Sequence, residues 1–448
     1  MATAIDSAIL GNLVGTEAMR AVFADQQRIQ RWLDVESALA KVEARLGIIP
    51  QAAADEIARN CRQERIDMTA LGAQTERAGT PIVGLVRQLI ALCGEPHGQY
   101  CHWGATSQDI IDTATALQMR EALALIDADL AAIAATLAAL ARRYRDTPMA
   151  GRSYLQHAAP ISFGYKMACL LSAVERHRAR LAELRPRVLA GQFGGAVGTL
   201  ASLAGRGLEV RAALMRELGL SEPDIAWHTQ RDRIAEVGCF LGLATGTLAK
   251  LATDVKLMMQ TEVGEVAEPY TAGRGASSAM PQKRNPVASV YIEACATVVS
   301  QHAALLLGAM AADHERSSGA WQVEWIVLPE AFVLTAGALA HSRALLEGLQ
   351  IDVERMRENL DLTHGLIAAE AVTMALAPHL GRERAHQLVT ELCRQALEQK
   401  RDLLDLLAAT SEVAAHLDRA ALARLCDPAN GLGLAGAMVD RVLAGRRG

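Results

Sequence analysis

Aromatic side chains are scarce in this chain of 448 residues. Phe, Trp and Tyr together make up only 4% of the sequence, although 51% of the residues are hydrophobic. The apolar content consists mainly of Ala and Leu, which favour helices, and not of the aromatic and β-branched residues that favour strands. The composition therefore predicts helix throughout, in a chain long enough for two or three domains.

An excess of basic residues is also absent. The 45 Lys and Arg residues are outnumbered by 50 Asp and Glu residues, which gives a net charge of -5. A nucleic-acid-binding protein would need a broad basic surface, so this class is excluded. A local basic pocket for a small anion remains compatible with the balance.

Long uninterrupted hydrophobic runs are missing as well. The longest runs, such as Ala303 to Ala312, stop at a charge well short of the roughly 18 to 20 residues that span a bilayer. The N-terminus, MATAIDSAIL, has no basic segment before an apolar stretch, so no secretory signal is visible. We expect a soluble, cytoplasmic protein that does not associate with membranes.

The eight cysteines are scattered through apparent helices, which suits reduced thiols better than a disulfide framework. Cys93, His97, Cys101 and His102 lie close together and are candidate zinc ligands. Their spacing lacks the usual C-x2-C or H-x3-5-H pairing, so a loop next to a site is the better interpretation. We expect no metal and no organic cofactor.

Two stretches carry the hydrophobic repeat of a packed helix. Residues 119–144 and 237–258 place apolar side chains at alternating steps of four and three. Proline-free, Ala-rich segments after Pro160, Pro286 and Pro329 also predict long helices. Helices of about 25 to 30 residues reach roughly 40 Å and are expected to pack as a bundle.

These patterns predict an all-α protein with three helical domains. Residues 1–111 would form an N-terminal domain, residues 112–350 a central bundle of five long helices with a polar loop, and residues 351–448 a C-terminal domain. The boundaries follow changes in the density of Gly and Pro.

Three polar segments interrupt the apolar pattern next to long helices, and such interruptions are candidate sites. In residues 101–109, Thr106 or Ser107 can cap the following helix, whose free amides could receive an anion. Capping alone is the simpler alternative. Residues 151–160 gather Arg, Tyr, Gln and His side chains, although a single histidine is more often structural than catalytic.

The third segment, residues 273–286, reads GRGASSAMPQKRNP. It brings two hydroxyls, three cations and Asn285 into a loop that is too rich in Gly and Pro to be helical. Hydrogen-bond donors and positive charge are concentrated there without a carboxylate, as an anionic substrate requires.

Two further motifs carry weaker signals. The glycines within residues 191–198 could suggest a phosphate loop, but no predicted strand precedes them and no Walker lysine follows. Residues 227–233, WHTQRDR, could form a substrate-facing turn or a solvated helix start.

Together the three polar segments resemble the fumarase/aspartase superfamily, and the likeness covers nearly the whole chain. Residues 277–286 match its signature loop GSSxMPxKxNP, with Ala276 in place of the glycine. Residues 106–109 resemble its TSxD region, and residues 151–156 its GRTHxQ block. The resemblance implies a cofactor-free homotetramer that acts on a small polycarboxylate, with each site assembled from different subunits.

The resemblance also implies roles for individual residues. Ser277 would be the catalytic residue, exchanging a proton with the carbon next to a carboxylate, while Lys283 and Asn285 would bind that carboxylate. The remaining expected substrate-binding residues are Thr106, Ser107, Gln156, His157 and Arg231.

Departures from the superfamily pattern indicate the substrate. The usual histidine of GRTHxQ is Tyr154 here, which becomes an alternative proton carrier and makes protonation of a leaving group less expected. Residues 30–36, 227–233 and 360–367 are similar to bacterial 3-carboxymuconate cycloisomerases, in which the substrate's own carboxylate adds to its diene. The competing hypotheses are adenylosuccinate lyase or another fumarate-releasing lyase, and a non-catalytic helical scaffold.

Overall fold

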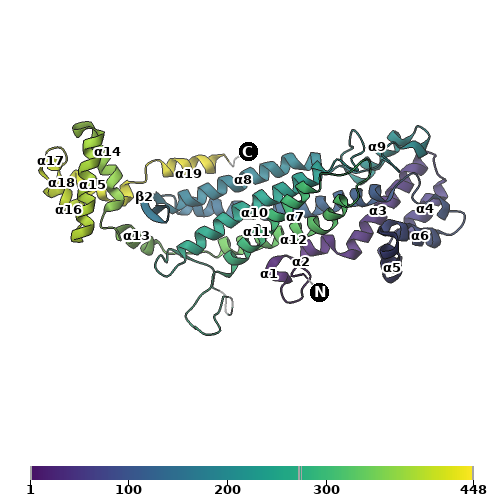
Figure 1. Cartoon of the computed structure of the whole chain (residues 1–448), viewed down its shortest axis with the longest axis horizontal. Coiled ribbons are helices and arrows are strands. Elements are labelled where there is room, and N and C mark those ends of the chain that lie inside the picture. The colour runs from purple at the N-terminus through teal and green to yellow at the C-terminus, as the bar shows by residue number, and fades with distance from the viewer. Residues whose placement is uncertain (1–2, 271–272, 274, 446–448) are drawn as a thin grey trace. The chain divides into compact units, whose positions relative to one another are not determined.

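The computed structural model describes residues 3–270, 273 and 275–445 (Figure 1). It confirms the predicted all-α fold: the described residues form nineteen α-helices and only four short strands. The strands pair as two separate two-stranded ladders, β1 with β2 and β3 with β4.

Five long helices of 22 to 37 residues are present, as predicted. The two hydrophobic repeats lie in α7 and α10. The first repeat has eight positions, of which six are buried, and all seven positions of the second are buried. Burial of these repeats provides the main packing energy of the helices. The long helices are α7 (Ser107–Arg143), α8 (Phe163–Val188), α10 (Asp232–Met258), α11 (Val287–Gly308) and α12 (Ala320–Glu347).

The helix expected to follow Pro329 begins nine residues earlier, at Ala320, and contains the proline. Proline removes one helical hydrogen bond and usually breaks a helix at a cost of about 3 kcal/mol. The cost is offset here because residues on both sides of Pro329, including Trp321, Leu328 and Phe332, are buried. Tertiary packing therefore overrides the local signal.

Four of these helices, α7, α10, α11 and α12, are long and apolar enough to cross a membrane, judged by length and composition alone. We expected no such segment, because charges interrupt every apolar run. An Ala-rich window tolerates one or two charges and still reaches a mean hydropathy of 1.4 to 1.9. The most apolar windows of α11 and α7 are only 33% and 39% buried, so their exposed apolar surface needs an explanation.

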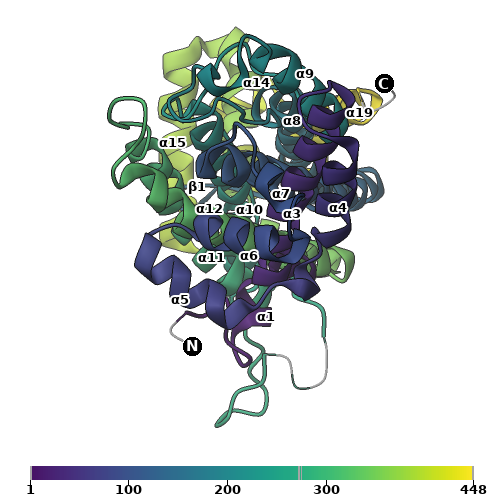
Figure 2. The ribbon, with the colours of Figure 1, turned by 90° about the vertical axis from the view of Figure 1, so that its right-hand side faces the viewer.

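The described chain divides into two compact units, each built from several segments. Unit 1 comprises residues 1–130, 177–249 and 291–341, and it contains the N-terminal helices. In it α3 packs on α4 and α9, and α5 packs on α6 (Figure 2). Its shorter helices are α1 (Gly11–Val14), α2 (Glu17–Phe23), α3 (Asp25–Arg45), α4 (Gln51–Asn60), α5 (Met68–Ala78), α6 (Pro81–Cys93) and α9 (Gly207–Leu218).

Unit 2 comprises residues 131–176, 250–290 and 342–448. Its C-terminal helices enclose a separate apolar core that includes Val372, Leu392 and Leu407. The elements of this unit besides the long helices are β1 (Pro148–Ser153), β2 (Gln156–Ser162), β3 (Val266–Ala267), β4 (Gln350–Ile351), α13 (Val353–Asp361), α14 (Ala369–Leu380), α15 (Arg382–Gln399), α16 (Leu403–Ala409), α17 (Ser411–Ala414), α18 (Arg419–Cys426) and α19 (Ala435–Ala444). The division into three consecutive domains at residues 111 and 350 stays a prediction.

Candidate active site

The loop that matches the signature lies in unit 2, before α11. Ser277 is half-buried, and its Oγ accepts hydrogen bonds from the amides of Ala279 and Met280, at 3.3 and 3.0 Å. The hydroxyl proton therefore remains available for donation. Asn285 donates to the carbonyl of Gly275 at 3.1 Å, while Lys283 is exposed and its ammonium forms no ion pair with a described residue. The loop thus presents a hydroxyl and a cation.

The first amides of α11 already have acceptors within the protein, and that of Val287 donates to the carbonyl of Asn285 at 2.9 Å. The buried carboxylate of Glu268 already accepts from the amides of Ala288 and Ser289, at 2.9 and 2.8 Å, and from the Ser289 hydroxyl at 2.7 Å. A carboxylate at a helix N-terminus satisfies free amides and interacts favourably with the helix dipole. This contact fixes the helix on which the loop ends.

The second polar segment forms a β-hairpin in unit 2 and not a simple lead into a helix. Tyr154 and Leu155 form the turn, both with positive φ, 50° and 63°, as tight hairpin turns require. Glycine or asparagine usually supplies this geometry, and neither occurs at the turn. The structure places Tyr154 at the tip, 98% exposed.

The hairpin is fixed by an ion pair between Arg152 and the buried carboxylate of Glu265. Arg152 of β1 donates through two nitrogens to Glu265, at 2.9 and 2.6 Å, and Asn359 of α13 donates to the same carboxylate at 2.9 Å. Next to it, burial and the Arg152 charge lower the pKa of His157, so that this imidazole is neutral at pH 7. Gln156 follows the turn and is exposed.

The first polar segment lies in unit 1 and begins α7. Asp109 is fully buried and accepts from the amides of Thr106, Gly194 and Gly195 at 2.9 to 3.0 Å, and its Oδ1 lies 2.7 Å from Nε2 of His228. The glycine-rich segment therefore encloses a carboxylate of the protein, not a phosphate. The partly exposed hydroxyls of Thr106 and Ser107 form no hydrogen bond with a described residue and are available to a ligand.

Arg231 is 2% exposed, between two buried carboxylates of unit 1. It donates to both oxygens of Asp112, at 2.7 and 3.0 Å, and to both oxygens of Glu324. Residues 227–233 are therefore not a solvated helix start, because Trp227, His228 and Arg231 are all buried. The nitrogens of Arg231 already have protein partners, and its expected contact with substrate stays a prediction.

Arg316 was not identified from the sequence, although the structure places it beside the first polar segment. It donates to the Gln108 side-chain oxygen at 2.7 Å and to the carbonyl of Ala196, and it forms no ion pair with a described carboxylate. Burial lowers its pKa, while Asp109 and Asp112 act in the opposite direction. No local motif marks this residue, since it lies 208 positions after its hydrogen-bond partner.

The cysteine and histidine cluster considered as a zinc site does not assemble. The Sγ atoms of Cys93 and Cys101 are 4.0 Å apart, but His102 turns away to Glu36, with 2.6 Å between Nδ1 and Oε1. In the part of the chain that the structure describes, no three His, Cys, Asp or Glu side chains are arranged to hold a metal ion.

The structure therefore divides the expected site residues into three groups. Thr106, Ser107 and Arg231 belong to unit 1. In unit 2, no described hydrogen bond joins the signature loop to the hairpin. The loop group is Ser277, Lys283 and Asn285, and the hairpin group is Tyr154, Gln156 and His157.

Two models of known lyase families match this chain. The family model described as lyase matches residues 13–300, and the model described as adenylosuccinate lyase C-terminus matches residues 365–442. The two matches together cover most of the chain, including all three polar segments.

The names of three similar proteins state an enzymatic activity. A 3-carboxy-cis,cis-muconate cycloisomerase of Pseudomonas aeruginosa is 52% identical over 95% of this chain and 94% of its own. Trans-aconitate decarboxylase 1 of Mycosarcoma maydis is 51% identical over 97% of this chain and 88% of its own. The crystal structure of the 3-carboxy-cis,cis-muconate lactonizing enzyme of Pseudomonas putida superposes with a TM-score of 0.91 at 45% identity, over 96% of this chain and 97% of that one.

Proposed function

The chain belongs to the fumarase/aspartase superfamily of lyases, and on this basis we propose that it converts 3-carboxy-cis,cis-muconate to 4-carboxymuconolactone in the degradation of aromatic compounds. The observation that carries the proposal is Tyr154, which occupies the position of the superfamily histidine at the tip of the hairpin. A ring closure within one molecule has no leaving group to protonate, so it does not need that histidine.

The proposed reaction forms one C–O bond and one C–H bond. An oxygen of a substrate carboxylate adds to the diene, and the displaced electron pair moves to the carbon next to another carboxylate. The resulting aci-carboxylate carries two negative charges, which Lys283 and Asn285 stabilise more strongly than they do the substrate. The Ser277 hydroxyl then gives its proton to the carbon, and it removes that proton in the reverse direction.

Arg316 is a further candidate for binding a substrate carboxylate. Its guanidinium is partly buried, has no carboxylate partner among the described residues and lies against Gln108, next to the available hydroxyls of Thr106 and Ser107. Arginine binds carboxylates well because its planar donors can engage both oxygens. We assign Thr106, Ser107 and Arg316 to one carboxylate and the signature loop to another.

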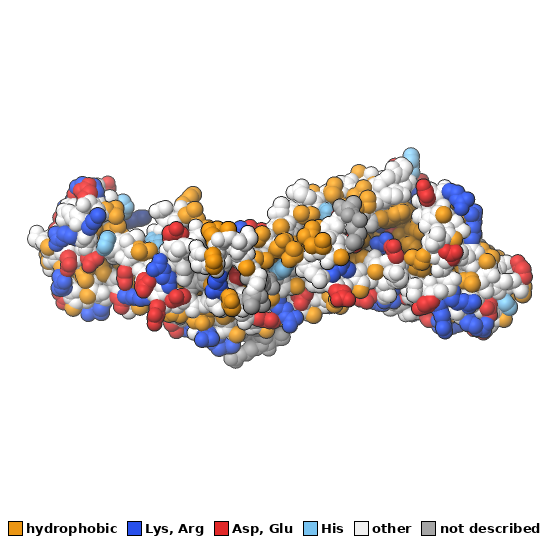
Figure 3. Space-filling model, turned by 90° about the horizontal axis from the view of Figure 1, so that it is seen from below, with side chains coloured by type: hydrophobic (Ala, Val, Ile, Leu, Met, Phe, Trp, Pro, Cys, Tyr) orange, Lys and Arg blue, Asp and Glu red, His pale blue; other side chains and the backbone are white. Residues whose placement is uncertain are grey.

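The active form is proposed to be a homotetramer with shared sites. In unit 1 the long helices expose Leu243 on α10, Leu305 on α11 and Ile326 on α12, each at least half exposed. The helical bundle in Figure 3 has many hydrophobic side chains at its surface, whereas charged side chains predominate over the C-terminal helices. Exposed apolar surface on this scale is typical of subunit contacts, and it explains the membrane-like composition of the helices.

The decisive experiment is a spectroscopic assay with the purified protein. Addition to 3-carboxy-cis,cis-muconate should remove the ultraviolet absorbance of the diene, with 4-carboxymuconolactone as the product by NMR. The same preparation should release no fumarate from adenylosuccinate. Fumarate release without diene loss would identify an amine-eliminating lyase, and inactivity in both assays and with trans-aconitate would favour the non-catalytic scaffold.

A second candidate activity is decarboxylation of trans-aconitate, favoured by the 51% identity to trans-aconitate decarboxylase 1. Loss of CO2 also leaves an electron pair on carbon that an acid must protonate, so Ser277 and the cation-rich loop would suit this reaction equally. Release of CO2 from trans-aconitate in place of diene loss would replace the primary proposal.

A further inference from the structure

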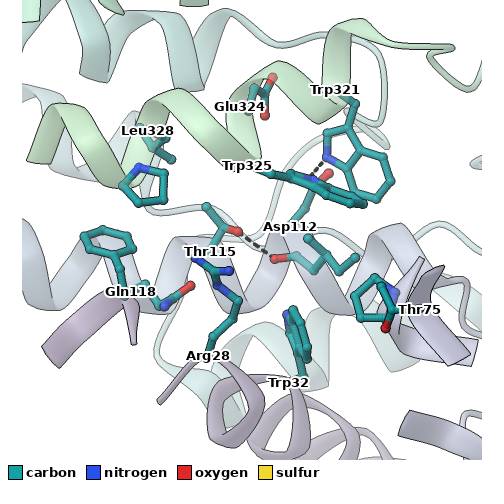
Figure 4. Close-up of a pocket in the computed structure, with 14 residues that line it drawn as sticks. Arg28, Trp32, Thr75, Asp112, Thr115, Gln118, Trp321, Glu324, Trp325 and Leu328 are labelled. Atoms are coloured by element: carbon teal, nitrogen blue, oxygen red, sulfur yellow. Dashed lines mark hydrogen bonds between the residues drawn. The ribbon is translucent and has the colours of Figure 1, made fainter. Parts of the chain in front are cut away.

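A cavity in unit 1 is not used by the proposed reaction. It has a volume of about 230 Å³ and lies between α3, α7 and α12 (Figure 4). Asp112, Thr115 and Gln118 line it from α7, but Thr106, Ser107 and Gln108 do not. The cavity is therefore distinct from the polar segment at the start of α7.

Indole rings form much of its wall. Trp32 enters from α3, and Trp321 and Trp325 enter from α12 on the opposite side (Figure 4). The two α12 rings are 4.9 Å apart and nearly perpendicular. Three of the five tryptophans of the chain thus surround one cavity, in a sequence with few aromatic residues. Because an apolar cavity of about 150 Å³ admits benzene, this one is large enough for a substituted ring.

One of the residues that line the cavity has a donor without an acceptor. The indole nitrogen of Trp325 is buried and has no hydrogen-bond partner among the described residues, whereas that of Trp321 donates to Asp112 at 3.0 Å. A buried indole N–H normally has a partner, because leaving it unpaired costs about 1 to 3 kcal/mol. A bound molecule with an acceptor atom would satisfy it.

The charged groups around the cavity balance. Asp112 and Glu324 line it and are paired with the buried Arg231, and Arg28 lines the opposite side. The sum of two negative and two positive charges is zero. Arg28 has only a weak partner, since Asp25 is 73% exposed and 3.7 Å away, and its side chain points towards Thr115 and Gln118 (Figure 4). Arg28 would repel a cationic ligand, and the carboxylates of Asp112 and Glu324 would repel an anionic one.

We propose that this cavity is a binding site for a small, uncharged aromatic molecule that carries one hydrogen-bond acceptor. The ring lies among Trp32, Trp321 and Trp325, and the acceptor receives the N–H of Trp325. Four probes of similar size, two uncharged and two charged, test the parts of this assignment.

Calorimetric titration of the full-length protein should detect benzamide, with a dissociation constant below about 1 mM, within the range open to a ligand of this size. Benzoate, benzylamine and the non-aromatic cyclohexanecarboxamide should each bind at least about tenfold more weakly. Trp325→Phe keeps a ring but removes the N–H, and should weaken benzamide about five- to tenfold. The matched control Trp103→Phe, at a 39% exposed tryptophan of the same unit, should leave the affinity unchanged.

A second variant tests the charge argument without altering an indole. Arg28→Met leaves a net charge of -1 around the cavity, so benzylamine should gain at least about fivefold relative to benzamide. The proposal is overturned by lack of benzamide binding at millimolar concentration, by unchanged benzamide affinity in Trp325→Phe, or by unchanged probe preference in Arg28→Met. Displacement of benzamide by 3-carboxy-cis,cis-muconate would make the cavity part of the substrate site. The titrations need no turnover, so their failure is separable from failure of the proposed reaction.

Discussion

At the scale of single residues, the proposed chemistry depends most on Ser277. Its oxygen accepts hydrogen bonds from two backbone amides, which would stabilise the alkoxide left by the proposed proton transfer. Ser277→Ala should lower kcat by about 100- to 10,000-fold, or roughly 3 to 5 kcal/mol in barrier, with fold and tetramer retained. Ser278→Ala is the matched control and should cost clearly less. A Ser277→Ala enzyme within about tenfold of wild type would exclude the role and direct attention to Tyr154.

Arg316 should affect substrate binding more than stability. Its removal leaves no described carboxylate unpaired, so Arg316→Gln should fold normally while kcat/KM falls by about 100-fold, mainly through KM. Arg187→Gln removes an exposed pair with Glu236 and serves as the control, with little change in either constant. Equal effects of the two substitutions on kcat/KM would show that Arg316 does not meet the substrate.

Glu43 makes stability depend on pH. It is fully buried in α3, its oxygens have no hydrogen-bond partner among the described residues, and burial together with Glu36 raises its pKa to about 9. An acid with a raised folded-state pKa contributes stability that is complete below the unfolded value near 4.5 and is lost as pH rises towards 9.

The variant Glu43→Gln cannot titrate and should lose this dependence. Relative to wild type it should gain up to about 3 kcal/mol between pH 5.5 and 7.5, because each pH unit contributes at most about 1.4 kcal/mol. Denaturant unfolding at both pH values measures the difference, with the exposed Glu76→Gln of α5 as control. Parallel curves for wild type and Glu43→Gln would contradict the assignment.

At the scale of elements, Glu268 determines how the signature loop joins α11. Glu268→Ala leaves the amides of Ala288 and Ser289 without their acceptor and should destabilise unit 2 by about 2 to 3 kcal/mol. Glu268→Gln keeps one acceptor oxygen and should destabilise unit 2 by about half as much. Thermal unfolding gives both values, and Glu347→Ala at the exposed end of α12 is the control. Equal midpoints for Glu268→Ala and wild type would mean that water satisfies these amides.

The hairpin and α12 show which elements the sequence could not predict. Tyr154 and Leu155 form a turn with positive φ without a Gly or Asn signal, because Arg152 and the buried Glu265 hold the strands in place. Pro329 predicts a helix boundary, yet α12 continues through it because both flanks are buried. In both cases contacts between distant segments outweigh the local preference.

At the scale of the whole molecule, the proposed shared site makes complementation possible. Ser277→Ala and a double variant, Thr106→Val with Ser107→Ala, should each have little activity alone. After subunit exchange of equal amounts, about a quarter of the sites should combine an intact loop with an intact first segment, if the two come from different subunits. Activity of the mixture and light scattering measure this. Lack of recovery despite exchange, or a fully active monomer, would exclude sharing.

The sequence by itself determined the helical class, the five long helices and the three polar segments. These features depend on local composition and on repeats of three and four residues, which are visible without knowledge of distant contacts. The buried repeats at Leu123, Ile126 and Leu248 were predictable for this reason. The signature residues Ser277 and Lys283 were recognisable because their motif is contiguous.

Only the tertiary structure decided which polar groups already form ion pairs or hydrogen bonds within the protein. Arg231 is paired with Asp112 and Glu324, and Glu268 occupies the amides of α11, although no sequence spacing predicts either contact. Arg316 was likewise identified only from its contacts in the structure. The physical reason is that a buried charge must find its partner in space, often more than 90 residues away in the chain, whereas helix formation is decided among residues three and four apart.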